Sequence, residues 1–235
     1  MSADKVATPA VEDYAKALYA LEVRGAGPVG TNALAERLGL TPGSVSAMLR
    51  KLAEIRLVSL APYHGVQLTG EGRRLALEVL RHHRLIELFL AEHLGMAWDR
   101  VHEEAEVLEH CLSEDLEAAI DEKLGHPTVD PHGDPIPSVD LVIDEGVTVS
   151  LESLAPPQRG VFVRVSDSNP EMLRFLGGKG ITPGDRLEIV EKQPFDGPML
   201  VRFPAGDAVL GGQLTQAMRV RLELVPADHG WVRGG

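Results

Sequence analysis

Through the first quarter of the chain, apolar residues recur every three or four positions, which is the spacing of a buried helix face. The predicted helices span 10–24, 31–40 and 42–55. Thr31 is expected to cap the second helix, and Thr41, followed by a proline, the third. Alternating residues over 57–69 then predict two short strands around a turn. Two short helices, a tight turn and a hairpin together indicate a winged helix.

The rest of the chain changes from helical to strand-like spacing near Gly160. Before that point a long helix is predicted from Thr69, with a break near His82. Another helix is predicted from about Trp98 to Leu124. After it, short alternating runs are separated by turns rich in Gly, Pro and Asp, with one short helix among them. About 65 residues of such strands make a small β-barrel. The predicted fold is therefore mainly α with a small β-barrel.

Charge is distributed unevenly along the chain. Overall, 35 acidic and 23 basic residues give a formal net charge of −12. Residues 1–74 hold nine basic and seven acidic residues, a balance of +2, and the remaining 14 basic and 28 acidic residues give −14. A surplus of positive charge at one end is compatible with nucleic-acid binding by that end alone.

Neither a membrane nor an oxidising compartment is indicated. No apolar run approaches the roughly 18 residues of a membrane span, and the N-terminus lacks the apolar stretch of a signal peptide. Cys111 is the single cysteine, which excludes a disulfide framework and suits a reducing cytoplasm. We therefore expect a cytoplasmic protein with no membrane partner, and Cys111 is expected to be a core residue.

The helix predicted over 42–55 has the features of a DNA-recognition helix. Small residues near its start let a helix sit deep in the major groove, and basic residues farther along can reach phosphates. The predicted DNA-binding residues are Thr41, Gly43, Ser44, Ser46, Ala47, Arg50 and Lys51. The alternative is a plain helical hairpin, because any such hairpin also has two short helices and a tight turn.

Acidic residues and histidines gather in the predicted helices of the middle region. Glu106, Glu109 and His110 stand at i, i+3 and i+4, so on one helix they project from one face. His102 extends this stripe by one turn. A further i, i+4 pair lies upstream, at His83 and Glu87. Converging carboxylates and imidazoles bind divalent first-row metals. The alternative is a solvated, charged helix face with incidental histidines.

A metal-dependent hydrolase is the alternative from another functional class, and it needs an open coordination position beside a substrate cleft. His102 and Glu103 begin like the zincin motif HExxH, but position 106 is Glu, so the second histidine is missing. The di-iron pattern Glu-x-x-His fails because Val107 precedes His110 by three. The sequence contains no P-loop or nucleophile elbow. We therefore expect a protein that is not an enzyme.

These features together resemble the diphtheria toxin repressor family of metal-activated homodimeric transcription repressors. The resemblance rests on HRLIE and VHEEAEVLEH in the helical region, DPHGDPIP at 130–137, and the winged helix and barrel on either side. It covers nearly the whole chain. It implies a winged helix-turn-helix DNA-binding domain (1–74), a helical dimerisation and metal-binding domain (75–142), a linker (143–158) and an SH3-like domain similar to ferrous transport protein A (159–226).

The resemblance also implies two metal sites. The primary site would use Asp13, Glu106, Glu109 and His110, and the second His83, Glu87 and His102, with Glu171 from the SH3-like domain. Iron-responsive members have Met and Cys at the positions of Asp13 and Glu106, whereas two carboxylates are the pattern of the manganese transport regulator branch. Short, two-domain members of that branch have a further carboxylate where this chain has Lys16, which argues against their binuclear site here.

The function implied is a manganese-activated, homodimeric repressor of metal-homeostasis genes. Mn²⁺ is the expected cofactor, with Fe²⁺ or Co²⁺ as substitutes, and the expected partner is a double-stranded DNA operator with an inverted repeat. The alternative is an iron-dependent regulator of the same family, because Fe²⁺ accepts the same ligands. Since Asp13 belongs to the DNA-binding domain and the other primary ligands to the dimerisation domain, bound metal would join the two.

Overall fold

The computed structural model describes residues 8–25, 27–61, 65–195 and 197–223, which divide into two compact units. Among these residues, the N-terminal unit holds those between 8 and 96 together with 101–130 and 135–144. The C-terminal unit holds 97–100, 131–134 and those between 145 and 223. Among the described residues, no helix has both the length and the apolar character needed to span a membrane.

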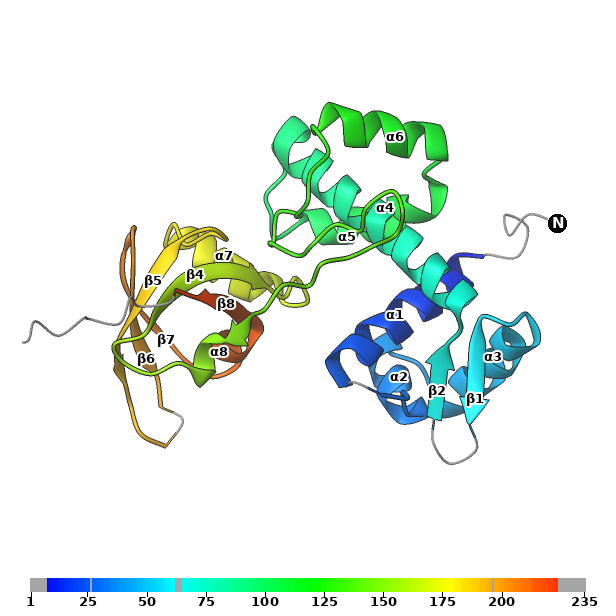
Figure 1. The fold of residues 1–235 in the computed structure, drawn as a ribbon, viewed down its shortest axis with the longest axis horizontal. Helices are drawn as coiled ribbons and strands as arrows, with labels where there is room; N and C mark the ends of the chain where they lie inside the picture. The colour runs from blue at the N-terminus through cyan, green and yellow to red at the C-terminus, as the bar shows by residue number, and fades with distance from the viewer. Residues whose placement is uncertain (1–7, 26, 62–64, 196, 224–235) are drawn as a thin grey trace, which may run out of the picture. The chain divides into compact units, whose positions relative to one another are not determined.

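The N-terminal unit begins with three helices and a two-stranded hairpin (Figure 1). These elements are α1 (Pro9–Gly25), α2 (Thr31–Leu38), α3 (Pro42–Glu54), β1 (Val58–Ala61) and β2 (Gly65–Leu68). Each helix contributes a fully buried leucine to one core, namely Leu18, Leu34 and Leu52. β1 and β2 pair in antiparallel register. The predicted winged helix-turn-helix is confirmed.

The helix starts in this region follow from local chemistry, with one departure. Thr41 Oγ1 accepts a hydrogen bond from Ser44 N at 3.3 Å, so α3 is capped as predicted. α2 begins differently, because Gly30 occupies the cap position without a side-chain hydrogen bond and Thr31 is the first helical residue. Val29 pairs with Val66 of the hairpin, and the helix starts directly after this extended contact. The predicted Thr31 cap is therefore wrong.

The long helix α4 (Gly70–Leu94) runs without a break. The predicted interruption near His82 is wrong, because residues 73–94 contain no glycine or proline and apolar residues on both sides of His82 are buried. Conversely, the single helix predicted from Trp98 to Leu124 is three elements, namely α5 (Val101–Leu108), the 3₁₀ turn η2 (Glu109–Cys111) and α6 (Glu114–Lys123). Ser113 Oγ caps α6 by accepting from Leu116 N at 3.3 Å, which starts a new helix where a continuous one was expected.

The hairpin is attached closely to the first turn of α4. Thr69 caps α4 by accepting from Gly72 N at 3.1 Å and also donates to the carbonyl oxygen of Arg56 at 2.7 Å. A Cβ at Gly72 would lie 2.0 Å from the carbonyl oxygen of Leu57, so only glycine fits there. The wing, which consists of β1 and β2, therefore packs directly against the start of α4.

Within the described residues, the C-terminal unit is built on a six-stranded antiparallel sheet in the order β3-β8-β4-β5-β6-β7, of which Figure 1 labels all strands except β3. The strands are β3 (Val149–Ser150), β4 (Arg159–Val165), β5 (Arg186–Lys192), β6 (Met199–Phe203), β7 (Gly206–Leu210) and β8 (Met218–Leu222). Its helices are η3 (Leu151–Ser153), α7 (Pro170–Gly178) and α8 (Gln213–Ala217). Irregular register in β4 and β5 bends the sheet around a core that includes Phe162 and Ile189. A mainly α chain with a small β domain is confirmed.

Part of the stretch predicted as a linker, 143–158, belongs to this sheet and its core. Val149 and Ser150 pair with β8, and Leu151 and Leu154 are almost completely buried. β3 could not be predicted from the sequence, because two residues are too few to show an alternating pattern. Residues 149–154 therefore contribute to the fold of the C-terminal unit.

Candidate metal centre and DNA-recognition helix

α3 presents its predicted DNA-binding residues on one accessible surface. Val45, Leu49 and Leu52 are buried against the other helices, which turns the opposite side of α3 outward. Every predicted DNA contact is exposed, namely Thr41, Gly43, Ser44, Ser46, Ala47, Arg50 and Lys51. Small side chains at the start and two cations in the last turns give this surface the dimensions and charge that a DNA groove requires.

We use "primary cluster" for Asp13, Glu106, Glu109 and His110, of which three meet closely. Asp13 comes from α1, whereas Glu109 and His110 come from η2. His110 Nε2 lies 3.2 Å from Asp13 Oδ1 and 3.7 Å from Glu109 Oε1. One ligand atom from each of these three residues lies within 4.8 Å of the others. A single cation at this point would have two carboxylates and one imidazole within reach.

Glu106 lies beside this group and forms another one with Glu109 and His83. Its Oε1 is 3.7 Å from His83 Nδ1, and Glu109 Oε2 is 2.5 Å from the same nitrogen. Glu106, Glu109 and His110 do not stand on one continuous α-helix as expected, because the chain changes from α5 to a 3₁₀ turn after Leu108, although Glu106 and Glu109 still converge on Lys16. The tighter turn directs Glu109 into the interior, where its side chain is fully buried.

Two residues around the primary cluster were not among the predicted ligands. Glu12 Oε2 is hydrogen-bonded to His110 Nδ1, which leaves Nε2 directed at Asp13 and Glu109. Lys16 Nζ donates to Glu106 Oε1 at 2.7 Å and to Glu109 Oε1 at 2.6 Å. The adjacency of Glu12 to Asp13 was the signal available in the sequence, but their separate roles require the three-dimensional arrangement.

Burial and charge shift the pKa values of the titrating groups in and around the primary cluster. Burial raises the pKa of Asp13 above its ordinary value, against the opposing charges of His110 and Lys16. Burial also acts to raise the pKa of Glu109, but the hydrogen bond and charge of His83 and the charge of Lys16 lower it overall. Burial opposes the ammonium of Lys16, yet the carboxylates of Glu109 and Glu106 raise its pKa. Glu109 is therefore an anion held by cations on two sides.

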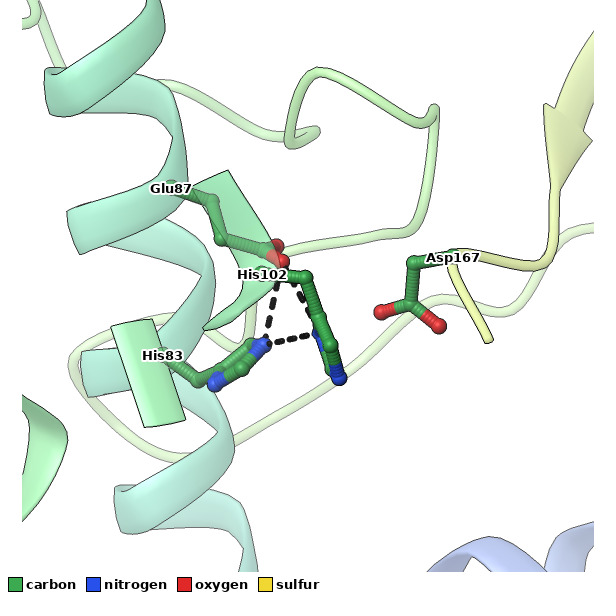
Figure 2. A group of neighbouring side chains, drawn as sticks. All are labelled: His83, Glu87, His102 and Asp167. Carbon is green, nitrogen blue, oxygen red and sulfur yellow. Dashed lines mark hydrogen bonds and ion pairs between the residues drawn. The ribbon is translucent and has the colours of Figure 1, made fainter. Parts of the chain in front are cut away.

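We use "second cluster" for His83, Glu87 and His102, which lie together between α4 and α5 (Figure 2). His83 Nε2 is 3.0 Å from Glu87 Oε1 and 3.1 Å from His102 Nδ1, and His102 Nδ1 is 3.3 Å from Glu87 Oε1. The Glu87 side chain is fully buried. Burial opposes protonation, but Glu87 and the hydrogen bonds to Glu109 and Glu87 raise the pKa of His83 to about 9.

The donor atoms of both clusters fit a divalent metal. Oxygen and nitrogen donors converge, no sulfur belongs to either set, and Glu106 and Glu109 of the primary cluster already attract a cation in the form of Lys16. Cys111 is exposed, so its expected place in the core is wrong. Glu171 is an exposed residue in the first turn of α7, in the C-terminal unit, where Asn169 Oδ1 accepts from its backbone N. Its participation in the second site stays a prediction.

Three family models match successive parts of the chain. Residues 7–66 match the iron dependent repressor N-terminal DNA binding domain, and 69–138 match the iron dependent repressor metal binding and dimerisation domain. Residues 149–222 match the FeoA domain. The candidate ligands divide between the first two models, because Asp13 falls in the DNA-binding domain and Glu106, Glu109 and His110 fall in the metal-binding and dimerisation domain.

Similar proteins cover almost the full chain. The iron-dependent repressor IdeR of Mycobacterium tuberculosis is 32% identical over 221 residues, which is 89% of this chain and 95% of the relative. The diphtheria toxin repressor of Corynebacterium efficiens is 30% identical over 89% of this chain and 94% of its own length. Among solved structures, a manganese-dependent transcriptional repressor in complex with manganese is 40% identical, with a TM-score of 0.85 over 91% of this chain and 100% of its own. The manganese regulator SloR is 31% identical, with a TM-score of 0.75 over 92% and 100%.

Proposed function

This chain belongs to the diphtheria toxin repressor family of metal-dependent transcription repressors, and from that premise we propose that manganese is its activating metal. Members of the family are repressors and not enzymes, so the metal-dependent hydrolase considered from the sequence is excluded. The observation that carries the manganese assignment is the donor set of the primary cluster, three carboxylates and one imidazole without sulfur. Oxygen-rich sets suit Mn²⁺, whereas thiolate and thioether ligands favour softer ions.

The primary cluster would couple metal binding to DNA binding because its residues belong to two domains. Asp13 is on α1 of the DNA-binding domain, and Glu106, Glu109 and His110 are on α5 and η2 of the metal-binding domain. Without a divalent cation, the single ammonium of Lys16 balances the three carboxylates only in part. A bound metal would supply the further positive charge that holds Asp13 together with Glu109 and His110. Metal and DNA then favour the same arrangement, and each raises the affinity for the other by an equal factor.

The second cluster is proposed as an ancillary metal site. His83, Glu87 and His102 offer two imidazoles and one carboxylate, and Glu171 of the FeoA domain is proposed as a further ligand. His83 and His102 must be neutral at the coordinating nitrogen, so metal binding there displaces protons. This site would stabilise the metal-binding domain and its dimer, because its three central residues all lie on α4 and α5.

The DNA partner is proposed to be an operator with an inverted repeat. A symmetric dimer presents two copies of α3, and their separation has to match successive major grooves of the operator. Arg50 and Lys51 would contact phosphates, whereas Ser44 and its small neighbours lie at the end of the helix that enters the groove. Genes of metal homeostasis are the expected targets.

An iron-dependent regulator is the second candidate. Fe²⁺ accepts the same carboxylate and imidazole ligands, and the relative from Mycobacterium tuberculosis is named an iron-dependent repressor. The two candidates differ in the metal that activates at a physiological concentration, which can be measured directly.

The test is operator binding under anaerobic conditions with Mn²⁺, Fe²⁺, Co²⁺ or Zn²⁺ in one buffer, using an operator selected from random duplexes in the presence of Mn²⁺. We expect Mn²⁺ to activate fully and Zn²⁺, which tends to four-coordination, to bind but activate poorly. In the double variant Asp13→Met/Glu106→Cys, the concentration ratio of Mn²⁺ to Fe²⁺ at half-maximal binding should rise. Equal operator affinity in chelator and in Mn²⁺ would contradict metal activation. An unchanged ratio would show that Asp13 and Glu106 do not set the metal preference, and activation of wild type by Fe²⁺ at lower concentrations than Mn²⁺ would favour the iron candidate.

A further inference from the structure

Lys16 lies between the two carboxylates that the primary cluster draws from α5 and η2. Its ammonium is 2.7 Å from Glu106 Oε1 and 2.6 Å from Glu109 Oε1, and its side chain is only 15% exposed. The bond partners are 90 and 93 positions away in sequence, so this contact joins α1 to the metal-binding domain. Lys16 therefore makes the same connection between elements that a metal bound by Asp13 and Glu109 would make.

Both oxygens of Glu109 are engaged in these contacts. Oε1 accepts from Lys16, and Oε2 lies 2.5 Å from His83 Nδ1. Glu106 Oε1 also accepts from Lys16. A metal that uses Glu106 or Glu109 therefore has to share or break an ion pair with Lys16, and its charge has to approach a second positive charge within a largely buried cluster.

We propose that Lys16 is a built-in counter-cation that competes with the activating metal for Glu106 and Glu109. In the absence of metal it neutralises the two carboxylates and fastens α1 to α5 and η2. In its presence Lys16 weakens metal binding and so raises the metal concentration at which the protein responds. This inference rests on the proposed function, because it concerns the metal affinity of the same cluster.

A purely structural ion pair would behave differently when the lysine is replaced. Losing a structural contact disorders Glu106 and Glu109, so metal binding weakens together with stability. Losing a competing cation lowers stability in chelator but leaves a more negative and more accessible site, so metal binding strengthens. The two interpretations predict opposite signs for the change in metal affinity.

The experiment compares the full-length protein with Lys16→Met, which keeps the length of the side chain and removes its charge. Lys123→Met is the matched control, because Lys123 is an exposed lysine of α6 that forms no ion pair with any residue the structure describes. Mn²⁺ affinity is measured by isothermal titration calorimetry, and the melting temperature is measured in excess chelator. We expect Lys16→Met to bind Mn²⁺ about tenfold more tightly or better and to melt at a lower temperature in chelator. Lys123→Met should match wild type in both.

Two further variants keep the test decisive if Lys16→Met folds poorly. Lys16→Gln removes the charge and retains a hydrogen-bond donor, so it should also bind Mn²⁺ more tightly. Lys16→Arg retains the charge and should stay near wild type. Equal or weaker Mn²⁺ binding in the uncharged variants overturns the inference, while Mn²⁺ binding by wild type leaves the proposed function intact. Failure of wild type itself to bind Mn²⁺ overturns both.

Discussion

The two clusters of the N-terminal unit contain the same kinds of side chain but connect different parts of the chain. The primary cluster joins α1 to η2 through Asp13, Glu109 and His110. The second cluster joins α4 to α5, which are neighbouring helices of one domain. Ligands drawn from two domains can make metal binding change how those domains sit, whereas ligands from adjacent helices mainly stabilise the domain that carries them.

The clusters also differ in the source of their positive charge. In the primary cluster most of it comes from Lys16, which contacts both Glu106 and Glu109, whereas His83 reaches only the other oxygen of Glu109 from the second cluster. In the second cluster it comes from His83, whose pKa Glu87 and Glu109 raise to about 9 against the effect of burial. A lysine has to be displaced as a whole group, but a histidine can release a proton and coordinate with the same nitrogen. Competition with metal should therefore depend on pH mainly in the second cluster.

Removing the residue that bridges the domains should have the largest effect. Asp13→Ala should lower Mn²⁺-activated operator affinity about hundredfold, because the link to α1 is lost while the other ligands remain. Stability in chelator should change little, since burial already disfavours the charged form of Asp13. Fluorescence anisotropy with labelled operator measures the operator affinity, and thermal melting measures the stability in chelator.

Ser44→Glu is the matched comparison for that variant. A carboxylate on the exposed start of α3 should abolish operator binding and leave Mn²⁺ affinity unchanged. If Asp13→Ala instead activates as well as wild type, the primary cluster does not couple the two domains.

A substitution in the second cluster should have the opposite effect to Asp13→Ala, because it should lower stability and leave operator affinity nearly unchanged. Glu87→Gln replaces a fully buried carboxylate paired with His83, and should lower the free energy of unfolding by about 2 kcal/mol. Operator affinity in saturating Mn²⁺ should stay close to wild type. Chemical denaturation measures the loss, with the exposed Glu104→Gln on α5 as control. A collapse of operator affinity with unchanged stability would show that both clusters have one role.

Removing the residue that orients His110 should have a smaller effect on Mn²⁺ affinity, and this effect should be confined to the primary cluster. Glu12→Gln removes the charge that orients His110 through Nδ1, and should weaken Mn²⁺ binding about tenfold. Titration calorimetry measures the affinity. If Mn²⁺ affinity in this variant equals that of wild type, the His110 ring is held by its other contacts.

The pH dependence should give the smallest effect. Protonated His83 has a raised pKa, so its contribution to stability is complete below about pH 6.5 and is lost as pH rises through about 9. In chelator, the melting temperature of wild type should therefore fall more between pH 6.5 and 9.5 than that of His83→Gln. His82 also has a raised pKa, because its hydrogen bond and charge interaction with Glu117 outweigh burial, and the His83 variant isolates the one contribution from the other. If the melting temperatures of wild type and His83→Gln fell equally with pH, the assignment of this loss of stability to His83 would be wrong.

The sequence predicted the elements that depend on periodicity and caps. α1, α3 and the wing follow from regular spacing of apolar residues and from Thr41 with Pro42. The change from α5 to η2 was missed because an apolar pattern shifts little between a helix and a single 3₁₀ turn. That turn decides where Glu109 and His110 lie relative to Glu106.

The residues of the two clusters were predicted from residue type and spacing, but the contacts that join distant parts of the chain were not. His83 and Glu87 are four residues apart on one helix, so their contact follows from spacing. The ion pairs of Lys16 with Glu106 and Glu109 link positions some 90 residues apart, and no local pattern encodes them. In the sequence, Lys16 stands out only as the position where short members of the manganese branch have a carboxylate.

Because α4 is one unbroken helix, a small rotation near its middle displaces its ends. It has 25 residues, and at 1.5 Å per residue it is about 37 Å long. His83 lies 13 residues from its first residue, at a distance of about 20 Å along the axis. A tilt of about 5° around His83 would therefore displace the start of α4 by roughly 1.7 Å. Because Gly72 leaves no space between that start and the wing, the wing would travel with it, over a distance large enough to break a hydrogen bond to DNA.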